Sequence, residues 1–201
     1  MATTEKKANP RKVITGKVRL SYCHLTEPRA RNAKDEPKYS TALIIPKTDK
    51  VTMKALRAAE KLALEEGLAE HKFTQREVDL GKKSNGTKGV SLSIIKDGDE
   101  DADLERNPEY AGCWYMNVSA GTRKPGIVDR QLEPITDPTE IYSGCYVRAS
   151  LTAFAYSNES KGVTFGLNHI QKIADGDPLG GMSRAEDDFD EMDDDDDDDV
   201  L

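Results

Sequence analysis

The sequence predicts a mainly β fold, a barrel or a sandwich, with one substantial helix and an acidic C-terminal tail. Short segments of alternating apolar and polar residues recur along the chain between glycine-marked turns, as is typical of such folds. Only residues 50–71 carry apolar side chains at helical spacing. These observations divide the chain into a flexible basic arm (1–12), a folded domain (13–178) and a disordered acidic tail (179–201).

The first predicted strand covers residues 13–26 and contains Gly16, which is expected to mark a bend or bulge. Because side chains alternate across a strand, its two faces differ in chemistry. The face that is expected to lie in the core carries Ile14, Val18, Leu20 and Tyr22. The opposite, polar face carries Lys17, Arg19 and Ser21.

The remaining elements follow from the same patterns. Further strands are expected at residues 38–45, 90–95, 110–120, 127–130, 145–156 and 163–173. The helix is expected to follow Asp49 as its N-cap residue and to weaken or end near Gly67. Residues 81–89 are expected to form a basic, glycine-rich loop. This loop lacks the G-x-x-x-x-G-K-[ST] pattern, which argues against a nucleoside triphosphate site.

The composition indicates a cytoplasmic protein without a secretion signal or a membrane span. The first residues are polar and basic, and no apolar run approaches the roughly 18 residues that a membrane-spanning helix needs. Cys23, Cys113 and Cys145 lie far apart in separate predicted strands. Reduced, partly buried thiols are therefore expected rather than disulfides or a zinc site.

The formal net charge of −8 conceals an uneven distribution. Residues 183–201 contain 12 acidic residues and one arginine, so the rest of the chain has 28 basic against 25 acidic residues. Residues 1–50 alone contain 12 basic and five acidic residues. A mildly basic body joined to an acidic tail suggests a polyanionic ligand such as a nucleic acid.

The predicted strand at residues 145–156 is the most informative segment. One face carries the small apolar residues Cys145, Val147, Ala149, Leu151, Ala153 and Ala155. The other carries Tyr146, Arg148, Ser150, Thr152, Phe154 and Tyr156. Exposed aromatic side chains beside a guanidinium group offer a stacking surface for unpaired bases and a phosphate contact. The alternative is that another segment covers these aromatic side chains as a second small core.

Two other regions extend this basic and aromatic character. In strand 110–120, Trp114 is expected in the core and Tyr115 on the surface, next to a basic turn. The residues predicted to contact phosphates are Lys17, Arg19, Arg123, Lys124 and Arg148, with Lys38 beside them. The residues predicted to stack on bases are Tyr39, Tyr115, Tyr146, Phe154 and Tyr156. Because cations in a turn are often only solvated, that alternative stays open for Arg123 and Lys124.

The sequence has no arrangement typical of an enzyme, and it predicts no cofactor or metal site. His24, His71 and His169 are scattered, without a cysteine or carboxylate partner at metal-ligand spacing. The acidic segment from Asp97 to Glu105 partly resembles a calcium loop but lacks the glycine at its sixth position. A metal-dependent nuclease that uses this segment is kept as an alternative function.

The chain ends in a run of aspartates with two apolar residues after it: Asp193, Asp194, Asp195, Asp196, Asp197, Asp198, Asp199, Val200 and Leu201. Such a run repels itself and stays extended. Because it is similar to a row of DNA phosphates, it is expected to compete with DNA for a cationic groove and, once displaced, to bind partner proteins. A tail that only increases solubility is the alternative.

Seven segments, in order along the chain, resemble a family of tailed-phage single-stranded-DNA-binding proteins that was long catalogued as a domain of unknown function. They are Val18–Tyr22, Glu36–Ser40, Ile44–Lys47, Lys124–Asp129, Tyr142–Ala149, Phe165–Gln171 and Asp175–Gly181, followed by the acidic end. The resemblance implies an OB-fold-like Greek-key barrel, binding without catalysis, and a tail that regulates binding and contacts replication proteins. Two features depart from the pattern: the helix follows the second predicted strand, and the tail ends in Val-Leu rather than in an aromatic residue.

The patterns and the resemblance together predict sequence-tolerant binding of single-stranded DNA in phage replication or recombination. Duplex DNA is expected to bind weakly if at all, and replication proteins are expected to bind the tail. No membrane partner is expected, and a homodimer is left open. A protein-interaction adaptor whose barrel binds no nucleic acid is the main alternative function.

Overall fold

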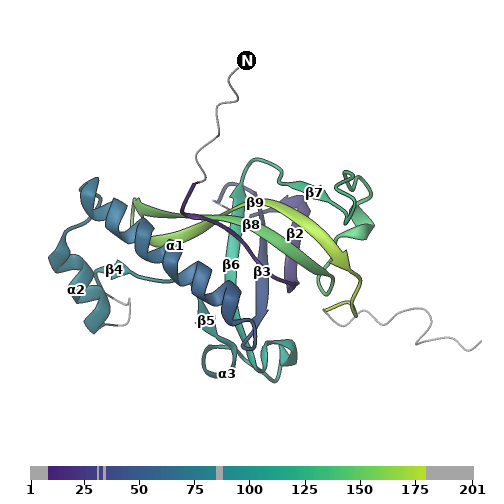
Figure 1. The fold of residues 1–201 in the computed structure, drawn as a ribbon, viewed down its shortest axis with the longest axis horizontal. Helices are drawn as coiled ribbons and strands as arrows, with labels where there is room; N and C mark the ends of the chain where they lie inside the picture. Colours follow the sequence, from purple (N-terminus) through teal and green to yellow (C-terminus); the bar gives the residue numbers. More distant parts are fainter. Residues whose placement is uncertain (1–8, 31, 34, 85–87, 180–201) are drawn as a thin grey trace, which may run out of the picture.

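The computed structural model describes residues 9–30, 32–33, 35–84 and 88–179, and Figure 1 shows a barrel of strands with one long helix beside it. The strands are β1 (Lys12–Ile14), β2 (Val18–Arg29), β3 (Lys38–Pro46), β4 (Val90–Ser91), β5 (Lys96–Asp97), β6 (Cys113–Gly121), β7 (Gly126–Val128), β8 (Tyr146–Ser157) and β9 (Lys161–Ala174). The helices are α1 (Lys50–Ala69), α2 (Gln75–Lys83) and α3 (Gly98–Asp101), and the 3₁₀ helices are η1 (Pro108–Tyr110) and η2 (Pro138–Glu140).

The long strands close into a barrel because β8 has partners on both of its edges. Around the barrel the order is β2-β3-β6-β9-β8, and β8 then pairs with β2. These pairs are antiparallel except that of β6 with β9, which run parallel at Ser119 and Gly166. A closed Greek-key barrel of five such strands is typical of the OB-fold. The predicted fold class is therefore confirmed.

The first predicted strand is in fact two strands, β1 and β2, which lie one after the other along the same edge of β8. Between them, the N–H of Gly16 donates to the Thr52 hydroxyl of α1 at 2.8 Å, and a side chain at this glycine would collide with Asp49. The break shifts the alternation by one residue, so Val13 is buried and Ile14 is half exposed. The prediction that Ile14 lies in the core is wrong, although Gly16 does mark a break.

A second irregularity turns Tyr22 outward, which contradicts the prediction that this residue lies in the core. The pairing of β2 with β3 shifts register between Ser21 and His24, and Tyr22 has a positive φ of 48°. Leu20 and Ser21 are buried before the bulge, whereas Tyr22 is 59% exposed. No glycine marks this bulge, so simple alternation extends the core face one residue too far.

Helix α1 begins where the sequence predicts and packs its apolar side against the barrel (Figure 1). The Asp49 side chain accepts the Thr52 N–H at 3.0 Å, which satisfies one of the unpaired donors of the first turn. The buried apolar side chains of the helix include Leu56, Ala59 and Ala63. Gly67 lies inside the helix, which continues to Ala69. A glycine is needed at this position because the Phe73 ring occupies the space that a side chain would need.

A second helix, α2, covers part of the segment predicted as a basic loop. Thr74 and Glu77 form a capping box, in which each side chain accepts the other residue's N–H. A separate small core beside this helix consists of Phe73, Val78, Val90 and Ala155. Gly81 packs directly against the Val90 carbonyl, so it allows a close approach rather than a turn.

The barrel interior follows the alternation predicted for β8. Every second side chain from Cys145 to Ala155 is buried, while Arg148 and Phe154 on the other face are exposed. Inward side chains of the neighbouring strands complete the core, among them Leu43, Met116 and Phe165, with Trp114 packed at its margin. The two faces predicted for this strand are confirmed.

Other element boundaries differ from the prediction. The strand predicted at residues 90–95 is reduced to β4, which pairs with β9, and Tyr110 belongs to η1 rather than to β6. No helix in the described part of the chain is long and apolar enough to span a membrane. The three cysteines are free thiols, and burial raises the pKa of Cys23 to about 12.

The two predicted appendages fall largely outside the described residues. Strand β1 begins at Lys12, the last residue of the predicted arm, and residues 1–8 are not described. Leu179, the first residue of the predicted tail, donates its N–H to the Ser143 carbonyl at 2.8 Å. The rest of the predicted tail, including the aspartate run, lies in residues 180–201, outside the described residues.

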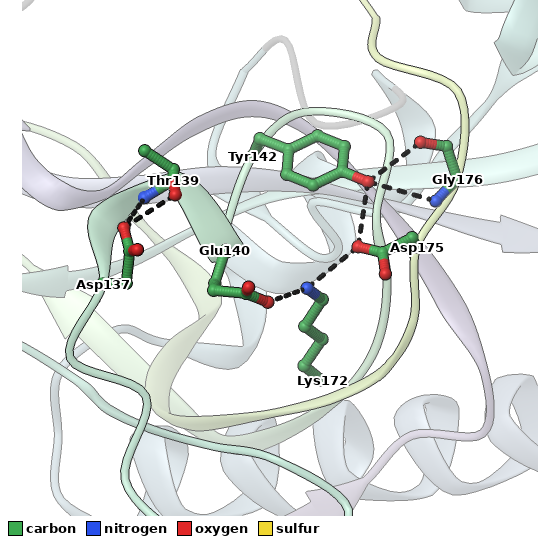
Figure 2. A network of polar contacts seen from close by, with 7 residues as sticks. All are labelled: Asp137, Thr139, Glu140, Tyr142, Lys172, Asp175 and Gly176. Carbon is green, nitrogen blue, oxygen red and sulfur yellow. Dashed lines mark hydrogen bonds and ion pairs between the residues drawn. The ribbon is translucent and has the colours of Figure 1, made fainter.

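A polar network fastens the last described residues to the barrel (Figure 2). Lys172 forms ion pairs with Glu140 and, at 2.9 Å, with Asp175. The Tyr142 hydroxyl lies 3.1 Å from Asp175 Oδ1 and 3.0 Å from the Gly176 carbonyl, and it accepts the Gly176 N–H. Burial of Lys172 opposes its charge, but the two carboxylates hold its pKa above the ordinary value. The network fixes the place where the chain leaves β9.

Candidate nucleic-acid interface

A groove of about 1000 Å³ crosses the outer face of the barrel. It extends from β2 over β3 and β6 to β9 and β8, which are neighbours in that order. Four strand spacings of roughly 4.8 Å give a path about 19 Å long. β3 and β6 are the second and third strands of the barrel, and this face binds oligonucleotides in many OB-folds. The side chains along its walls include Tyr22, Arg29, Lys38, Tyr115, Asn117 and Phe154.

Short side chains form the floor of the groove. In the antiparallel pairing of β3 with β6, Ser40 lies opposite Ser119 and Ala42 lies opposite Asn117. All four line the groove, whereas Leu43 and Met116 at alternate positions point into the core. Because these side chains are short, a planar base can approach the sheet closely here.

Three tyrosines form the wall at the β2 end of the groove. The Tyr110 and Tyr115 rings meet edge to face, with 4.8 Å between their centroids. The Tyr115 hydroxyl donates to the Asp101 carbonyl at 3.3 Å, and the Tyr22 hydroxyl donates to Asn107 Oδ1 at 2.8 Å. Burial raises the pKa of Tyr110 and of Tyr115, so both phenols stay protonated at neutral pH.

Phe154 stands at the other end of the groove and is 39% exposed. Its register partner on β9 is Thr164, and its ring lies beside Gly166, where a side chain would crowd it. Among the described residues, neither core cluster includes this ring. The prediction that Tyr115 and Phe154 lie on one exposed surface is consistent with this geometry, since both line the same groove.

The charges around the groove are mixed. Arg29 and Lys38 are register partners at the base of the loop between β2 and β3, which places two cations together. Acidic side chains line the same groove: Asp35, Glu36, Asp101 and Asp103. Burial, with the nearby Arg29 charge, lowers the pKa of His24, so this imidazole is neutral at pH 7. The groove therefore offers aromatic and polar contacts more than net positive charge.

A second, basic hollow of about 430 Å³ lies beside the groove. Among the described residues, the charged side chains that line it are Lys12 of β1 and Arg123 and Lys124 of the turn before β7. His169 of β9 also lines it, and its Nδ1 accepts the Gly126 N–H at 3.2 Å. This bond leaves Nε2 as the N–H donor of the neutral ring. The hollow suits a phosphate better than a base.

Several predicted site residues lie away from both hollows. Lys17 and Arg19 flank the Tyr146 ring, with Lys17 Nζ 4.1 Å from its centroid. Arg19 also donates to the Gly144 and Asp177 carbonyls, so it holds the end of the described chain. Eight residues of β8 separate this cluster from Phe154, a distance of about 26 Å along an extended strand. The structure does not bring Tyr146 and Phe154 together.

The other three predicted residues lie apart as well. Arg148 is exposed and its Nε donates to the Thr15 carbonyl at 3.2 Å. The Tyr156 hydroxyl lies against Gly162, near β4. Tyr39 alternates with Ser40 and is outside the described lining of either hollow. Their predicted contacts with DNA stay predictions.

The acidic segment considered as a metal site is engaged in other contacts. Lys47 forms ion pairs with Asp97 at 2.5 Å and with Asp99 at 2.7 Å. Asp99 also accepts the Gly112 N–H at 2.8 Å, and these two contacts lower its pKa. Among the described residues, no group of three His, Cys, Asp or Glu side chains is placed to hold a metal ion.

Sequence reasoning missed many residues of the two hollows, among them Tyr22, Arg29, Lys12 and His169. Tyr22 is hidden by a bulge that lacks a glycine, and Arg29 lies beyond the end of the strand predicted at residues 13–26, although β2 continues to it. Lys12 lies near Arg123 and Lys124 because β1 pairs with β8. His169 lies near them because β7, which follows their turn, pairs with β9. A long-range contact of this kind leaves no local pattern in the sequence.

Comparison with known proteins places the fold and the groove in context. A chain of similar length, protein p50 of Acyrthosiphon pisum secondary endosymbiont phage 1, is 28% identical over 193 residues, which are 94% of this chain and 98% of that protein. The crystal structure of gp2.5, a single-stranded DNA-binding protein encoded by bacteriophage T7, is similar in fold, with a TM-score of 0.58 and 14% identity over 88% of this chain and 91% of that one.

A similar solved structure is that of the single-stranded DNA-binding protein from bacteriophage Enc34 in complex with single-stranded DNA. Its TM-score is 0.60 and its identity 26%, over 86% of this chain and 91% of that one. A family model described as Enterobacter phage Enc34, ssDNA-binding protein, matches residues 11–201. The chain therefore belongs to the family of the Enterobacter phage Enc34 single-stranded-DNA-binding protein.

Proposed function

We propose that this protein binds single-stranded DNA without sequence preference and without catalysis, as part of phage DNA replication or recombination. The observation that carries the proposal is the groove on the outer face of β3 and β6, with Tyr22, Tyr115 and Phe154 along it. Stacking on aromatic side chains tolerates every base because every base has a π-face. Membership of a family of single-stranded-DNA-binding proteins supports the same ligand.

We propose that single-stranded DNA places its bases in the groove and a phosphate in the basic hollow. Lys12, Arg123 and Lys124 supply the positive charge that the groove itself largely lacks. This division fits a ligand whose bases are apolar and planar and whose backbone is anionic. A duplex keeps its bases stacked inside, so it gains little from the aromatic side chains.

The acidic tail is proposed to compete with DNA for the cationic side chains and to contact replication proteins once DNA displaces it. Residues 183–201 carry 12 acidic side chains and one arginine. A tethered polyanion has a high effective concentration near these cations, so it lowers the apparent affinity for DNA by occupying them. The weak charge of the groove makes this competition act mainly at the basic hollow.

The test is a fluorescence titration of an unstructured oligo-dT and of a matched duplex, over a range of salt concentrations. Full-length protein and a variant that ends at Met182 are compared. We expect salt-sensitive binding that is tighter for the single strand, and tighter again without the tail. If neither version binds oligo-dT at low salt, the proposal fails and the adaptor function takes its place. Shortening of the oligonucleotide in magnesium would instead indicate a nuclease.

A further inference from the structure

Tyr22 combines an exposed aromatic ring with an unfavourable backbone conformation. Its φ of 48° lies in the left-handed region, which residues with a Cβ atom rarely adopt. Among the described residues, the other non-glycine residues with positive φ are His71 and Leu132, and neither lines the groove. Residues held in such conformations cluster at functional sites, where the surrounding structure enforces them.

The surrounding contacts do enforce this conformation. Thr41 of β3 donates its hydroxyl to the Ser21 carbonyl at 3.0 Å, and the Cys23 N–H donates to the Ser143 hydroxyl at 2.9 Å. Both neighbours of Tyr22 are thus fixed by strands or loops on either side. The register shift between Ser21 and His24 then leaves the Tyr22 side chain only the outward direction.

The hydroxyl of Tyr22 is anchored as well. It donates to Asn107 Oδ1 at 2.8 Å, and Asn107 is itself fixed by hydrogen bonds from its N–H and Nδ2 to the Asp103 carbonyl. The ring is therefore held at its tip and at its backbone, although it is 59% exposed. An aromatic ring that is ordered before the ligand arrives loses little entropy on binding.

We propose that Tyr22 is a preformed stacking platform for an unpaired base at the β2 end of the groove. The proposal rests on the proposed function, because it specifies where one base of the single strand lies. Tyr22 of β2 and Phe154 of β8 then mark the two ends of the groove. The left-handed backbone of Tyr22 keeps its ring out of the core and in the proposed path of the DNA.

The first test is the pair of variants Tyr22→Gly and Leu132→Gly, titrated with oligo-dT at low salt. Each replaces an exposed residue of positive φ, 48° and 69° respectively, by the residue that adopts this conformation most easily. We expect Tyr22→Gly to weaken binding about tenfold or more, as for loss of one stacked base. Leu132→Gly is expected to bind like the wild type. Both thermal midpoints are expected to stay within a few degrees of the wild type.

A second pair separates stacking from the anchoring hydrogen bond. Tyr22→Phe and Tyr22→Leu both lose the bond to Asn107 and both keep a Cβ at positive φ, but only Phe keeps an aromatic ring. We expect the Tyr22→Phe variant to retain most of the affinity for oligo-dT and the Tyr22→Leu variant to lose it. Equal affinities for Phe and Leu would mean that Tyr22 only holds the loop that contains Asn107.

A direct readout uses an oligo-dT in which one thymine is replaced by 5-iodouracil. Near-ultraviolet irradiation links this base to an aromatic side chain on which it stacks, and peptide mapping is expected to find Tyr22. If the wild type binds oligo-dT while Tyr22→Gly binds equally well, this inference is overturned and the proposed function stands. If the wild type does not bind oligo-dT at all, both fall together.

Discussion

Thr152 and Phe154 lie two residues apart on the same face of β8, yet Thr152 lines the basic hollow and Phe154 lines the aromatic groove. Their register partners on β9, Gly166 and Thr164, continue the same surface. Asn168 of β9 donates to the Thr152 hydroxyl at 2.9 Å and also lines the basic hollow. The groove and the basic hollow therefore adjoin on this face of β8, so the proposed base site and the proposed phosphate site lie about 7 Å apart along the strand.

The first prediction concerns the base site. Phe154→Ala is expected to weaken oligo-dT binding by about 1–3 kcal/mol, because it removes one stacking ring. Ile14→Ala is the matched control, since Ile14 is also an exposed apolar residue on a strand but lies outside the described groove lining. Titration at one fixed salt concentration measures both. An unchanged affinity for Phe154→Ala would exclude this end of the groove from the DNA path.

The second prediction concerns the phosphate site. Arg123→Gln and Lys124→Gln are each expected to weaken binding and to reduce the slope of log K against log salt by about 0.7, as for one lost phosphate contact on a single strand. Lys54→Gln, at an exposed position of α1, is the control and should leave the slope unchanged. A weaker affinity with an unaltered slope would show that these residues act without contacting phosphate.

The sequence was sufficient for the parts of the fold that are locally regular. The alternation of β8 predicts its core and outer faces correctly because the extra residues at the two register shifts between β8 and β9 lie on β9, so the alternation of β8 itself is unbroken. The N-cap Asp49 predicts the start of α1 because a capping side chain acts within one turn. Where the register shifts without a glycine, as at Tyr22, the same rule assigns the wrong face.

The candidate site was predictable only in part, because it depends on which strands become neighbours. Tyr115 and Phe154 meet in one groove through the parallel contact of β6 with β9, which no local pattern encodes. Tyr146 has the same alternation and the same chemistry as Phe154. It is instead flanked by Lys17 and Arg19, and the latter holds Asp177 at the end of the barrel.

The third prediction concerns the pH dependence of stability. Hydrogen bonds from Lys161, at 2.6 Å, and from the Thr74 backbone and hydroxyl lower the pKa of Glu77 from 4.5 to about 2. A lowered carboxyl pKa contributes stability that is fully present above pH 4.5 and is lost as the pH falls toward 2. Glu77→Gln should therefore destabilise the protein at pH 7 and progressively less below pH 4.5.

Urea unfolding of the wild type and of Glu77→Gln between pH 7 and pH 3 measures this effect. Glu65→Gln is the control, because Glu65 is exposed and its contact with Lys61 is long, at 3.9 Å. It is expected to change the midpoint little at any pH. A gap between wild type and Glu77→Gln that stays constant down to pH 3 would contradict the link between α2 and β9 through this carboxylate.

The fourth prediction concerns the end of α1. His71 has a φ of 57° and forms a Schellman motif, in which its N–H donates to the Leu68 carbonyl and the Lys72 N–H donates to the Gly67 carbonyl. A left-handed residue with a Cβ costs about 1–2 kcal/mol, whereas glycine costs about 0.5–1 kcal/mol in backbone entropy. His71→Gly should therefore stabilise the protein by about 0.5–1 kcal/mol, a rise in Tm of roughly 1–4 °C.

The adjacent variant Glu70→Gly tests the cause of this gain. Glu70 is the C-cap residue and has a φ of −83°, so glycine there relieves no backbone strain. It adds freedom to the unfolded chain and removes the ion pair with Lys72 at 2.8 Å. Its Tm is expected to fall while that of His71→Gly rises. A rise for both would place the gain in the removal of side chains from this surface rather than in the backbone. Because both residues lie outside the described linings of the two hollows, oligo-dT affinity is expected to stay at the wild-type level in either variant.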